Sequence, residues 1–230
     1  MNNVMNKLVK TRAINAFNQW SGRYSHDVFP KLIKRGYGYQ PLAQEIVSYL
    51  SPLFGATILE FGTGSGILGK EVYAIRPDLS IIGMDISDKM LRHAKKTESY
   101  HQLIQCDAEN IPLDPRSYSY GYSAFMMHSL PHSKKFFNEI KRVMTTGSKL
   151  GVVDLFKMNT RNIFSKIMDN LHSYRFEHGA LSYYLTSKEF LALLKEADIA
   201  CDKNIALDAD RKIARLSEGS MAHHFFGLIV

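Results

Sequence analysis

Three glycines spaced two residues apart form the first chemically informative pattern of the chain. Gly62, Gly64 and Gly66 follow a short apolar run, residues 58–61, which is typical of a buried strand. The residues after them, 67–75, carry apolar side chains at a helical spacing. Glycine accepts positive φ and has no Cβ, so a strand, a glycine turn and a helix together let the backbone approach a nucleotide closely. A plain tight turn would show the same glycines, so other residues must discriminate between the two.

Acidic residues accompany three consecutive expected strands. Glu60 precedes the glycines, Asp85 ends the run 80–85, and Asp107 follows the run 100–106. Each acid alone also fits a turn or a helix cap. However, parallel strands end at one edge of an open sheet, where such sheets bind ligands. Asp85 lies about 20 residues after the glycines, where a carboxylate accepts hydrogen bonds from ribose hydroxyls. Asp107 is placed to accept one from the exocyclic amine of a base, so the sequence predicts a ligand that contains adenosine.

The surroundings of the glycines discriminate between kinds of adenosine ligand. A dinucleotide site shows Gly-x-Gly-x-x-Gly and holds a pyrophosphate at the helix N-terminus. This chain has Gly-x-Gly-x-Gly with Glu60 just upstream. A carboxylate there repels a diphosphate but suits a ligand that carries an ammonium group and a sulfonium charge. No Gly-Lys-Ser/Thr follows the turn, which excludes a phosphate-binding P-loop. The pattern therefore favours a cationic adenosyl amino acid.

Five segments between about residue 40 and residue 156 resemble the class I S-adenosylmethionine-dependent methyltransferases, in the small-molecule branch that includes quinone-biosynthesis enzymes. They are L-E-F-G-T-G-S-G, I-I-G-M-D-I-S, Q-C-D-A-E-N-I-P-L, M-M-H-S-L-P-H and F-N-E-I-K-R-V-M-T-T-G, in the family's order. The resemblance implies S-adenosyl-L-methionine as cofactor and S-adenosyl-L-homocysteine as product. Ser119 replaces the acid that often starts strand four, and Thr145-Thr146-Gly147 replaces the usual Pro-Gly-Gly turn. Both departures weaken the subfamily placement more than the function.

The resemblance also assigns the cofactor contacts. Glu60 and the first glycines would line the methionine end, Asp85 would hold the ribose, and Asp107 would meet the adenine edge. The full set expected to bind the cofactor is Tyr24, Glu60, Gly62, Thr63, Gly64, Gly66, Asp85, Ile86, Met90, Asp107, Ala108 and Phe125.

His128 is the candidate catalytic base, because it follows the fourth expected strand, where the acceptor and the methyl group should meet. A base is needed only when the acceptor carries a proton that must leave. A turn histidine that packs on the cofactor is the alternative. Pro131 interrupts any helix between His128 and His132, so no metal site is expected. The residues expected to contact the substrate are Trp20, His132, Phe156, Met168, His178 and Tyr183.

Strands alternate with helices over residues 58–156, and this alternation predicts an α/β fold with a doubly wound, mostly parallel sheet. With two strands expected after residue 200, the resemblance implies a seven-stranded Rossmann-like sheet. We expect a helical lid segment over residues 1–40 and a methyltransferase domain over residues 41–230. Within that domain, residues 158–186 are expected to form a helical cap insert after the fifth strand.

Composition limits the remaining function classes. The chain has 230 residues, 45% of them hydrophobic, and two distant cysteines, which favours one globular unit in a reducing compartment. No signal peptide or long apolar run is visible, so a cytoplasmic protein without a membrane span is expected. The net charge is +7, but the lysines and arginines are scattered in pairs, which favours solvated helix faces over nucleic-acid binding.

Methyl transfer to a small, apolar or aromatic metabolite is the favoured function, by a monomer or a homodimer. The sequence leaves open whether the methyl group goes to oxygen, nitrogen or carbon, and which acceptor receives it. Two alternatives remain: a nucleic-acid methyltransferase, suggested by the high isoelectric point, and a repurposed cofactor binder such as a cyclase.

Overall fold

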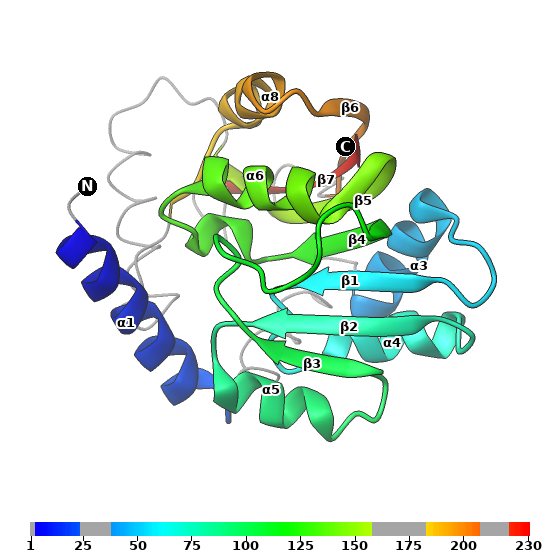
Figure 1. Cartoon of the computed structure of the whole chain (residues 1–230), viewed down its shortest axis with the longest axis horizontal. Helices are drawn as coiled ribbons and strands as arrows, with labels where there is room; N and C mark the ends of the chain where they lie inside the picture. Colours follow the sequence, from blue (N-terminus) through cyan, green and yellow to red (C-terminus); the bar gives the residue numbers. More distant parts are fainter. Residues whose placement is uncertain (1–2, 24–37, 158–182, 208–220) are drawn as a thin grey trace.

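The computed structural model describes residues 3–23, 38–157, 183–207 and 221–230. Its centre is a seven-stranded sheet in the order β3-β2-β1-β4-β5-β7-β6 (Figure 1). Strands β1 to β5 pair in parallel, whereas β7 runs antiparallel to both β5 and β6. The strands are β1 (Thr57–Phe61), β2 (Ser80–Asp85), β3 (Gln102–Gln105), β4 (Tyr118–Ala124), β5 (Met144–Lys157), β6 (Ala200–Ala206) and β7 (Met221–Ile229).

Helices flank this sheet on both faces and across one end. The described helices are α1 (Asn3–Trp20), α3 (Tyr39–Leu50), α4 (Ile67–Ile75), α5 (Asp88–Lys95), the 3-10 helix η1 (Met127–Ser129), α6 (Ser133–Val143) and α8 (Ser187–Glu196). The arrowheads of β1, β2 and β4 point toward the side of the molecule where α1 lies (Figure 1). The predicted α/β class and the mostly parallel, doubly wound sheet are confirmed.

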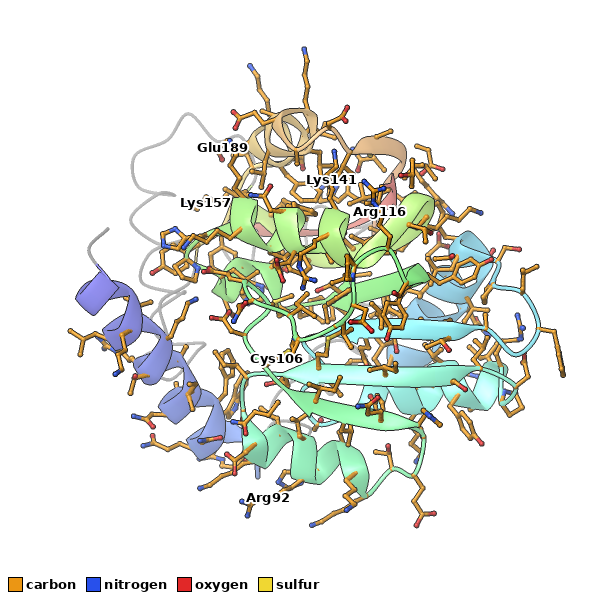
Figure 2. All side chains as sticks on the ribbon, in the orientation of Figure 1. Arg92, Cys106, Arg116, Lys141, Lys157 and Glu189 are labelled. Carbon is orange, nitrogen blue, oxygen red and sulfur yellow. The ribbon has the colours of Figure 1, made fainter. Side chains whose placement is uncertain are left out.

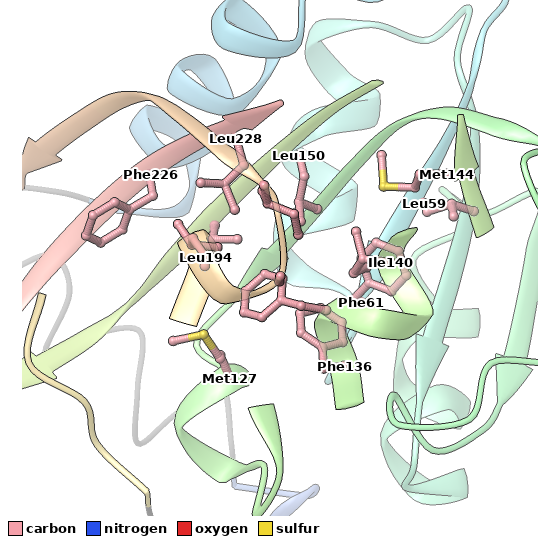
Figure 3. Close-up of a cluster of buried hydrophobic side chains, with 14 of the residues drawn as sticks. Leu59, Phe61, Met127, Phe136, Ile140, Met144, Leu150, Leu194, Phe226 and Leu228 are labelled. Atoms are coloured by element: carbon pink, nitrogen blue, oxygen red, sulfur yellow. The ribbon is translucent and has the colours of Figure 1, made fainter. Parts of the chain in front are cut away.

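Two hydrophobic clusters fill the space between the sheet and its helices. Phe136 and Ile140 of α6 pack with Phe190 of α8 against one face, and Figure 3 shows part of this cluster. The other face carries apolar side chains of α3 and α4, among them Ile46 and Val72. Alternation along each strand decides which residue meets which cluster. Two buried faces explain why the parallel strands read as apolar runs rather than as alternating patterns.

The last helix and the fifth strand begin earlier than the sequence pattern predicts. The pattern predicts Ser187 as the helix cap, but the cap is Thr186. Its hydroxyl accepts from the Glu189 N–H at 3.2 Å, and the Glu189 carboxylate accepts from the Thr186 N–H at 2.7 Å. The pattern also predicts a fifth strand over residues 149–156, preceded by a break at Gly147, yet β5 begins at Met144. The Gly147 N–H donates to the Val230 carbonyl at 2.7 Å, so pairing with the chain end extends the strand.

Alternation along β4 predicts that Tyr118, Tyr120 and Tyr122 share one face of the sheet, and this prediction is wrong. Tyr118 packs against the cluster under α6, while Tyr120 and Tyr122 pack against the cluster under α3 and α4. The pairing of β4 with β5 is irregular between Tyr118 and Tyr120, where the extra residues lie in β5. The pattern of β4 alone does not reveal an irregularity that its partner strand carries.

Candidate functional site

The glycine turn connects β1 to α4 and has the geometry that its glycines predict. Gly62, Gly64 and Gly66 have φ of 78°, 54° and 82°, in the left-handed region that side chains disfavour. A Cβ on Gly66 would lie 2.7 Å from the Ala94 Cα of α5, so this position also requires the absence of a side chain. A Cβ on Gly64 would meet nothing within 4 Å, which leaves that part of the backbone open to a ligand.

Glu60 is buried beneath this turn. Its side chain is on the α4 face of the sheet, and its Oε2 accepts a hydrogen bond from the Tyr100 hydroxyl at 2.6 Å. Burial raises the pKa of Glu60 to about 8, against the opposing influence of the Tyr100 and Tyr122 phenols. The same enclosure places the carboxyl group directly beneath the glycines. Its charge beside the cofactor and its place at the methionine end stay predictions.

Asp85 closes β2 and reaches back to the glycine turn. Its Oδ2 accepts from the Gly64 N–H at 2.8 Å and its Oδ1 accepts from the Ser87 N–H at 2.9 Å. Burial raises the pKa of Asp85, and these backbone hydrogen bonds oppose that effect. The carboxylate is half-buried at the carboxyl end of the sheet, so the turn and the ribose-binding candidate form one unit. This is the arrangement that the spacing between the glycines and Asp85 predicts.

Asp107 lies just after β3, where Figure 2 labels the preceding residue, Cys106. Its Oδ1 accepts from the Glu109 N–H at 2.9 Å, and its Oδ2 forms an ion pair with the Lys10 ammonium of α1. Lys10 also contacts the Glu109 Oε2 at 2.9 Å. Both carboxylate oxygens of the predicted adenine-binding residue therefore have partners within the chain.

A second polar contact fixes α1 beside the cofactor candidates. The Ser87 hydroxyl, which caps α5 by accepting from the Met90 N–H at 3.1 Å, donates to the Asn18 Oδ1 at 2.6 Å. Lys10 and Asn18 are two turns apart on α1, so the helix is held at two points along the carboxyl end of the sheet. This position agrees with a covering role for the N-terminal segment, which stays a prediction.

His128 lies in η1, directly beyond β4, and is buried. Its Nδ1 contacts the Oδ1 of Asp154, a fully buried carboxylate of β5. Its ring stacks on Tyr184, with the ring centroids 5.0 Å apart. The Tyr183 N–H donates to the His128 carbonyl at 2.6 Å. The structure thus brings together two of the predicted residues, His128 and Tyr183, and adds a carboxylate to the histidine.

The other described residues expected to bind the cofactor lie at the ends of β2, β3 and β4, in the glycine turn and in α5. Phe125 has a positive φ of 55°, an uncommon conformation for an aromatic residue, at the end of β4. Met90 is buried in α5, and Thr63 is buried in the turn. Ile86 and Ala108 are half-buried at the ends of β2 and β3. Tyr24, Met168 and His178 lie outside the described residues.

Three residues that were expected to contact the substrate pack against or hydrogen-bond to other residues of the chain. Phe156 is fully buried between the rings of Phe190 and Phe226, because alternation along β5 places it under α8. This corrects its assignment to the substrate site. Trp20 is buried in the cluster under α3 and α4. His132 precedes α6, and its N–H donates to the Glu109 Oε1 at 3.0 Å.

The sequence interpretation missed three residues of this region. Asp154 stands in the middle of an apolar run, and that break in the pattern was the available signal. Lys10 and Tyr100 meet the site from other elements, through Asp107 and Glu60. No spacing along the chain reveals such contacts. Among the described residues, no group of three or more histidines, cysteines or acids is arranged to hold a metal ion.

The residues present fit S-adenosylmethionine. The open backbone at Gly64 admits close approach, Asp85 offers its carboxylate at the edge where a ribose would lie, and Asp107 follows on the next strand. The acids at the strand ends suit a cationic ligand better than a diphosphate. Within the described parts of the chain, no helix is long and apolar enough to cross a membrane.

Comparisons with known proteins agree with this geometry. Residues 58–147 match the family model described as "Methyltransferase domain". A demethylmenaquinone methyltransferase of Thermotoga maritima is 23% identical over 205 residues, 81% of this chain and 87% of that protein.

Two solved structures show the same fold. Geranyl diphosphate C-methyltransferase from Streptomyces coelicolor, in complex with S-adenosyl-L-homocysteine, has a TM-score of 0.67 at 12% identity, with 82% of this chain and 78% of that chain covered. The [4+2]-cyclase SpnF has a TM-score of 0.68 at 14% identity, with 83% and 80% covered. The match over residues 58–147 and the relative from Thermotoga maritima, together with the glycine turn and the acids at the strand ends, identify the chain as a class I S-adenosylmethionine-dependent methyltransferase.

Proposed function

We propose that this methyltransferase acts on a small, apolar or aromatic metabolite, with His128 close to the reacting atoms. The observation that carries this proposal is the position of His128: it lies one short turn beyond β4, at the same sheet edge as the glycine turn and Asp85. The relative from Thermotoga maritima, which aligns along most of both chains, is named for the methylation of demethylmenaquinone, and this name supports the proposal.

In the proposed reaction, residues of the chain orient the cofactor and keep water away from the reacting atoms. Bound S-adenosylmethionine supplies an electrophilic methyl group. Gly64 and Asp85 orient the cofactor at the sheet edge, with Asp107 at the adenine. The Tyr183–Tyr184 segment and α1 exclude water from the two sides of the site. Alignment of nucleophile and methyl group in a water-poor site lowers the barrier of an in-line displacement by about 7–11 kcal/mol.

Transfer of a tritiated methyl group from the cofactor tests this proposal. The labelled cofactor is incubated with the full chain and, separately, with simple phenols, prenylated quinols, transfer RNA and duplex DNA. We expect label in the organic phase with apolar phenols or quinols, and at least a 100-fold lower yield with the His128→Gln variant. Label in the nucleic acid, or an equal yield from His128→Gln, would contradict the proposal.

A further inference from the structure

Asp154 is a buried carboxylate whose contacts concentrate on one histidine. It is fully buried in β5, on the face that packs against α6, and the alternating apolar residues Val152 and Phe156 flank it. Its Oδ1 contacts the His128 Nδ1 and accepts from the Leu155 N–H at 2.7 Å. Its Oδ2 accepts from the His128 N–H at 3.3 Å. Burial of a carboxylate in such surroundings is strongly unfavourable unless hydrogen-bond partners compensate for the lost water.

These contacts fix the proton arrangement of the imidazole. A carboxylate accepts hydrogen bonds, so the His128 Nδ1 must carry the proton that it donates to Asp154. In the neutral ring, Nε2 is then the basic nitrogen. The ring plane is held by stacking on Tyr184, with 14° between the planes, and the backbone of the loop is held by Tyr183. The imidazole thus has a defined orientation and a defined tautomer.

We propose that Asp154 is a positioning residue that makes His128 the general base of methyl transfer, and that the acceptor is therefore a hydroxyl-bearing aromatic compound whose proton must leave. This inference rests on the proposed function. The acceptor O–H proton moves to the His128 Nε2, and the electron pair released on the aromatic oxygen, or delocalised to a ring carbon, forms the bond to the methyl carbon. The methyl–sulfur bond breaks and its electron pair stays on sulfur, which leaves neutral S-adenosylhomocysteine. The Asp154 carboxylate balances the charge of the imidazolium.

The competing role for Asp154 is structural. Its hydrogen bond to the His128 N–H would also hold the β4–α6 loop on β5, whatever the imidazole does. A test must therefore report on the ring itself and not only on the loss of activity.

Nitrogen NMR of the full chain labelled with ¹⁵N-histidine gives that report without any substrate. The His128 signals are assigned by their absence in His128→Gln. We expect a protonated Nδ1 and an unprotonated Nε2 in the neutral ring of the wild type, and a shifted Nδ1 signal with mixed tautomers in Asp154→Asn. A wild-type ring protonated at Nε2, or an Nδ1 signal unchanged in Asp154→Asn, would overturn the proposal. The wild-type spectrum decides even if Asp154→Asn does not fold.

Steady-state kinetics with a phenolic acceptor are the second test of the role of Asp154. We expect Asp154→Asn to lower kcat by about 100-fold or more while KM for the cofactor stays within about twofold. In the double variant with His128→Gln, the loss should equal that of His128→Gln alone, because Asp154 acts through the ring. If the losses of kcat in the two single variants multiply in the double variant, Asp154 has a role that does not depend on His128.

The role of Asp154 and the proposed methyl transfer to phenols or quinols can be refuted separately. A wild-type chain that methylates apolar phenols but shows the wrong tautomer or multiplying losses refutes the role of Asp154 alone. A wild-type chain that transfers no methyl group to phenols or quinols refutes the proposed function, whichever tautomer the NMR spectrum shows.

Discussion

Glu60 is a carboxylic acid enclosed by the Tyr100 phenol, the facing residue Tyr122 of β4, and the first turn of α4. Gly69 of α4 allows this enclosure, because a Cβ there would lie 2.8 Å from the Glu60 Oε2. Removal of the acid from water makes its ionisation unfavourable, and the folded chain therefore holds the proton to a higher pH than the unfolded chain does.

This enclosure predicts a pH-dependent stability. The pKa of Glu60 rises from 4.5 to about 8 on folding, so its protonated form favours the folded state below pH 4.5, and that advantage is lost as the pH rises through 8. Glu60→Gln removes this titration. Relative to Glu60→Gln, the wild type should lose on the order of a few kcal/mol of unfolding free energy between pH 5 and pH 8. Thermal or urea unfolding at several pH values measures the difference.

Glu196→Gln, at a side chain that is 62% exposed, is the control and should give a curve parallel to that of the wild type. A curve for Glu60→Gln that also runs parallel to the wild type would show that Glu60 is ionised when the chain is folded.

At the scale of single residues, the sequence predicts the contacts of residues that lie at the ends of strands and in the turns that follow them. The glycines and Asp85 meet as expected because a strand, a turn and a helix are contiguous in the chain. The state of Glu60 could not be predicted, since it depends on Tyr100, which lies 40 positions away. The pairing of His128 with Asp154 was missed for the same reason: it joins η1 to a residue within β5, 26 positions away.

Helix α1 lies outside the sheet and contacts residues at or beside the expected cofactor site. Its Lys10 binds both Asp107 and Glu109, and its Asn18 accepts from Ser87. The Lys10 ammonium and an adenine amine would both donate to the Asp107 carboxylate, so they would compete for it. Cofactor binding and the seating of α1 should therefore be coupled, with Glu109 able to retain the lysine when Asp107 is released.

This coupling predicts that Lys10→Met raises the affinity for S-adenosylhomocysteine a few-fold, because the competing ammonium is gone. Lys7→Met, at an exposed residue of the same helix, is the matched control and should leave the affinity unchanged. Titration calorimetry of both variants gives the comparison. An unchanged or weaker affinity in Lys10→Met would indicate that the lysine stays on Asp107 when the cofactor binds.

At the scale of elements, helices and strands were predictable from apolar spacing, and their boundaries were less so. β2 matches its expected bounds, whereas β5 begins earlier because Gly147 pairs with the chain end. The position of α1 across the strand ends was not predictable in detail, because its contacts are ion pairs and hydrogen bonds that no apolar pattern records.

The largest described core cluster joins α6 and α8 to the strands β1, β2, β5 and β7. Phe190 of α8 is central to it, with ring centroids 5.8 Å from Phe137, 5.2 Å from Phe156 and 4.7 Å from Phe226. β6 and β7 attach to the parallel part of the sheet through the long pairing of β7 with β5. Asp154 lies two residues before Phe156 on β5, so it is on the face of the strand that this aromatic cluster covers.

Phe190→Ala should cost about 3–5 kcal/mol of unfolding free energy, because it leaves a cavity among rings that cannot all collapse into it. Phe54→Ala, at a side chain that is 90% exposed, should change the stability by less than about 0.5 kcal/mol. Urea unfolding at neutral pH measures both. Equal effects of the two substitutions would show that the core described here does not determine the stability.

The class of fold and the cofactor were predictable at this scale because both follow from a repeated strand–helix alternation and from residues at strand ends. The acceptor was not, since the residues expected to meet it are dispersed among α1, η1, α6 and the segment that contains Tyr183. Their side chains act together only after folding.

The central claim is that the edge formed by the glycine turn and Asp85 binds the adenosyl cofactor, and titration calorimetry with S-adenosylhomocysteine tests it most directly. We predict micromolar binding to the wild type and at least tenfold weaker binding to Asp85→Ala, which loses about 1.4 kcal/mol or more of charge-assisted hydrogen bonding. Asp88→Ala, at an acid in the first turn of the adjacent helix α5, should bind as the wild type does. No detectable binding to the wild type, or equal affinity in Asp85→Ala, would contradict the account.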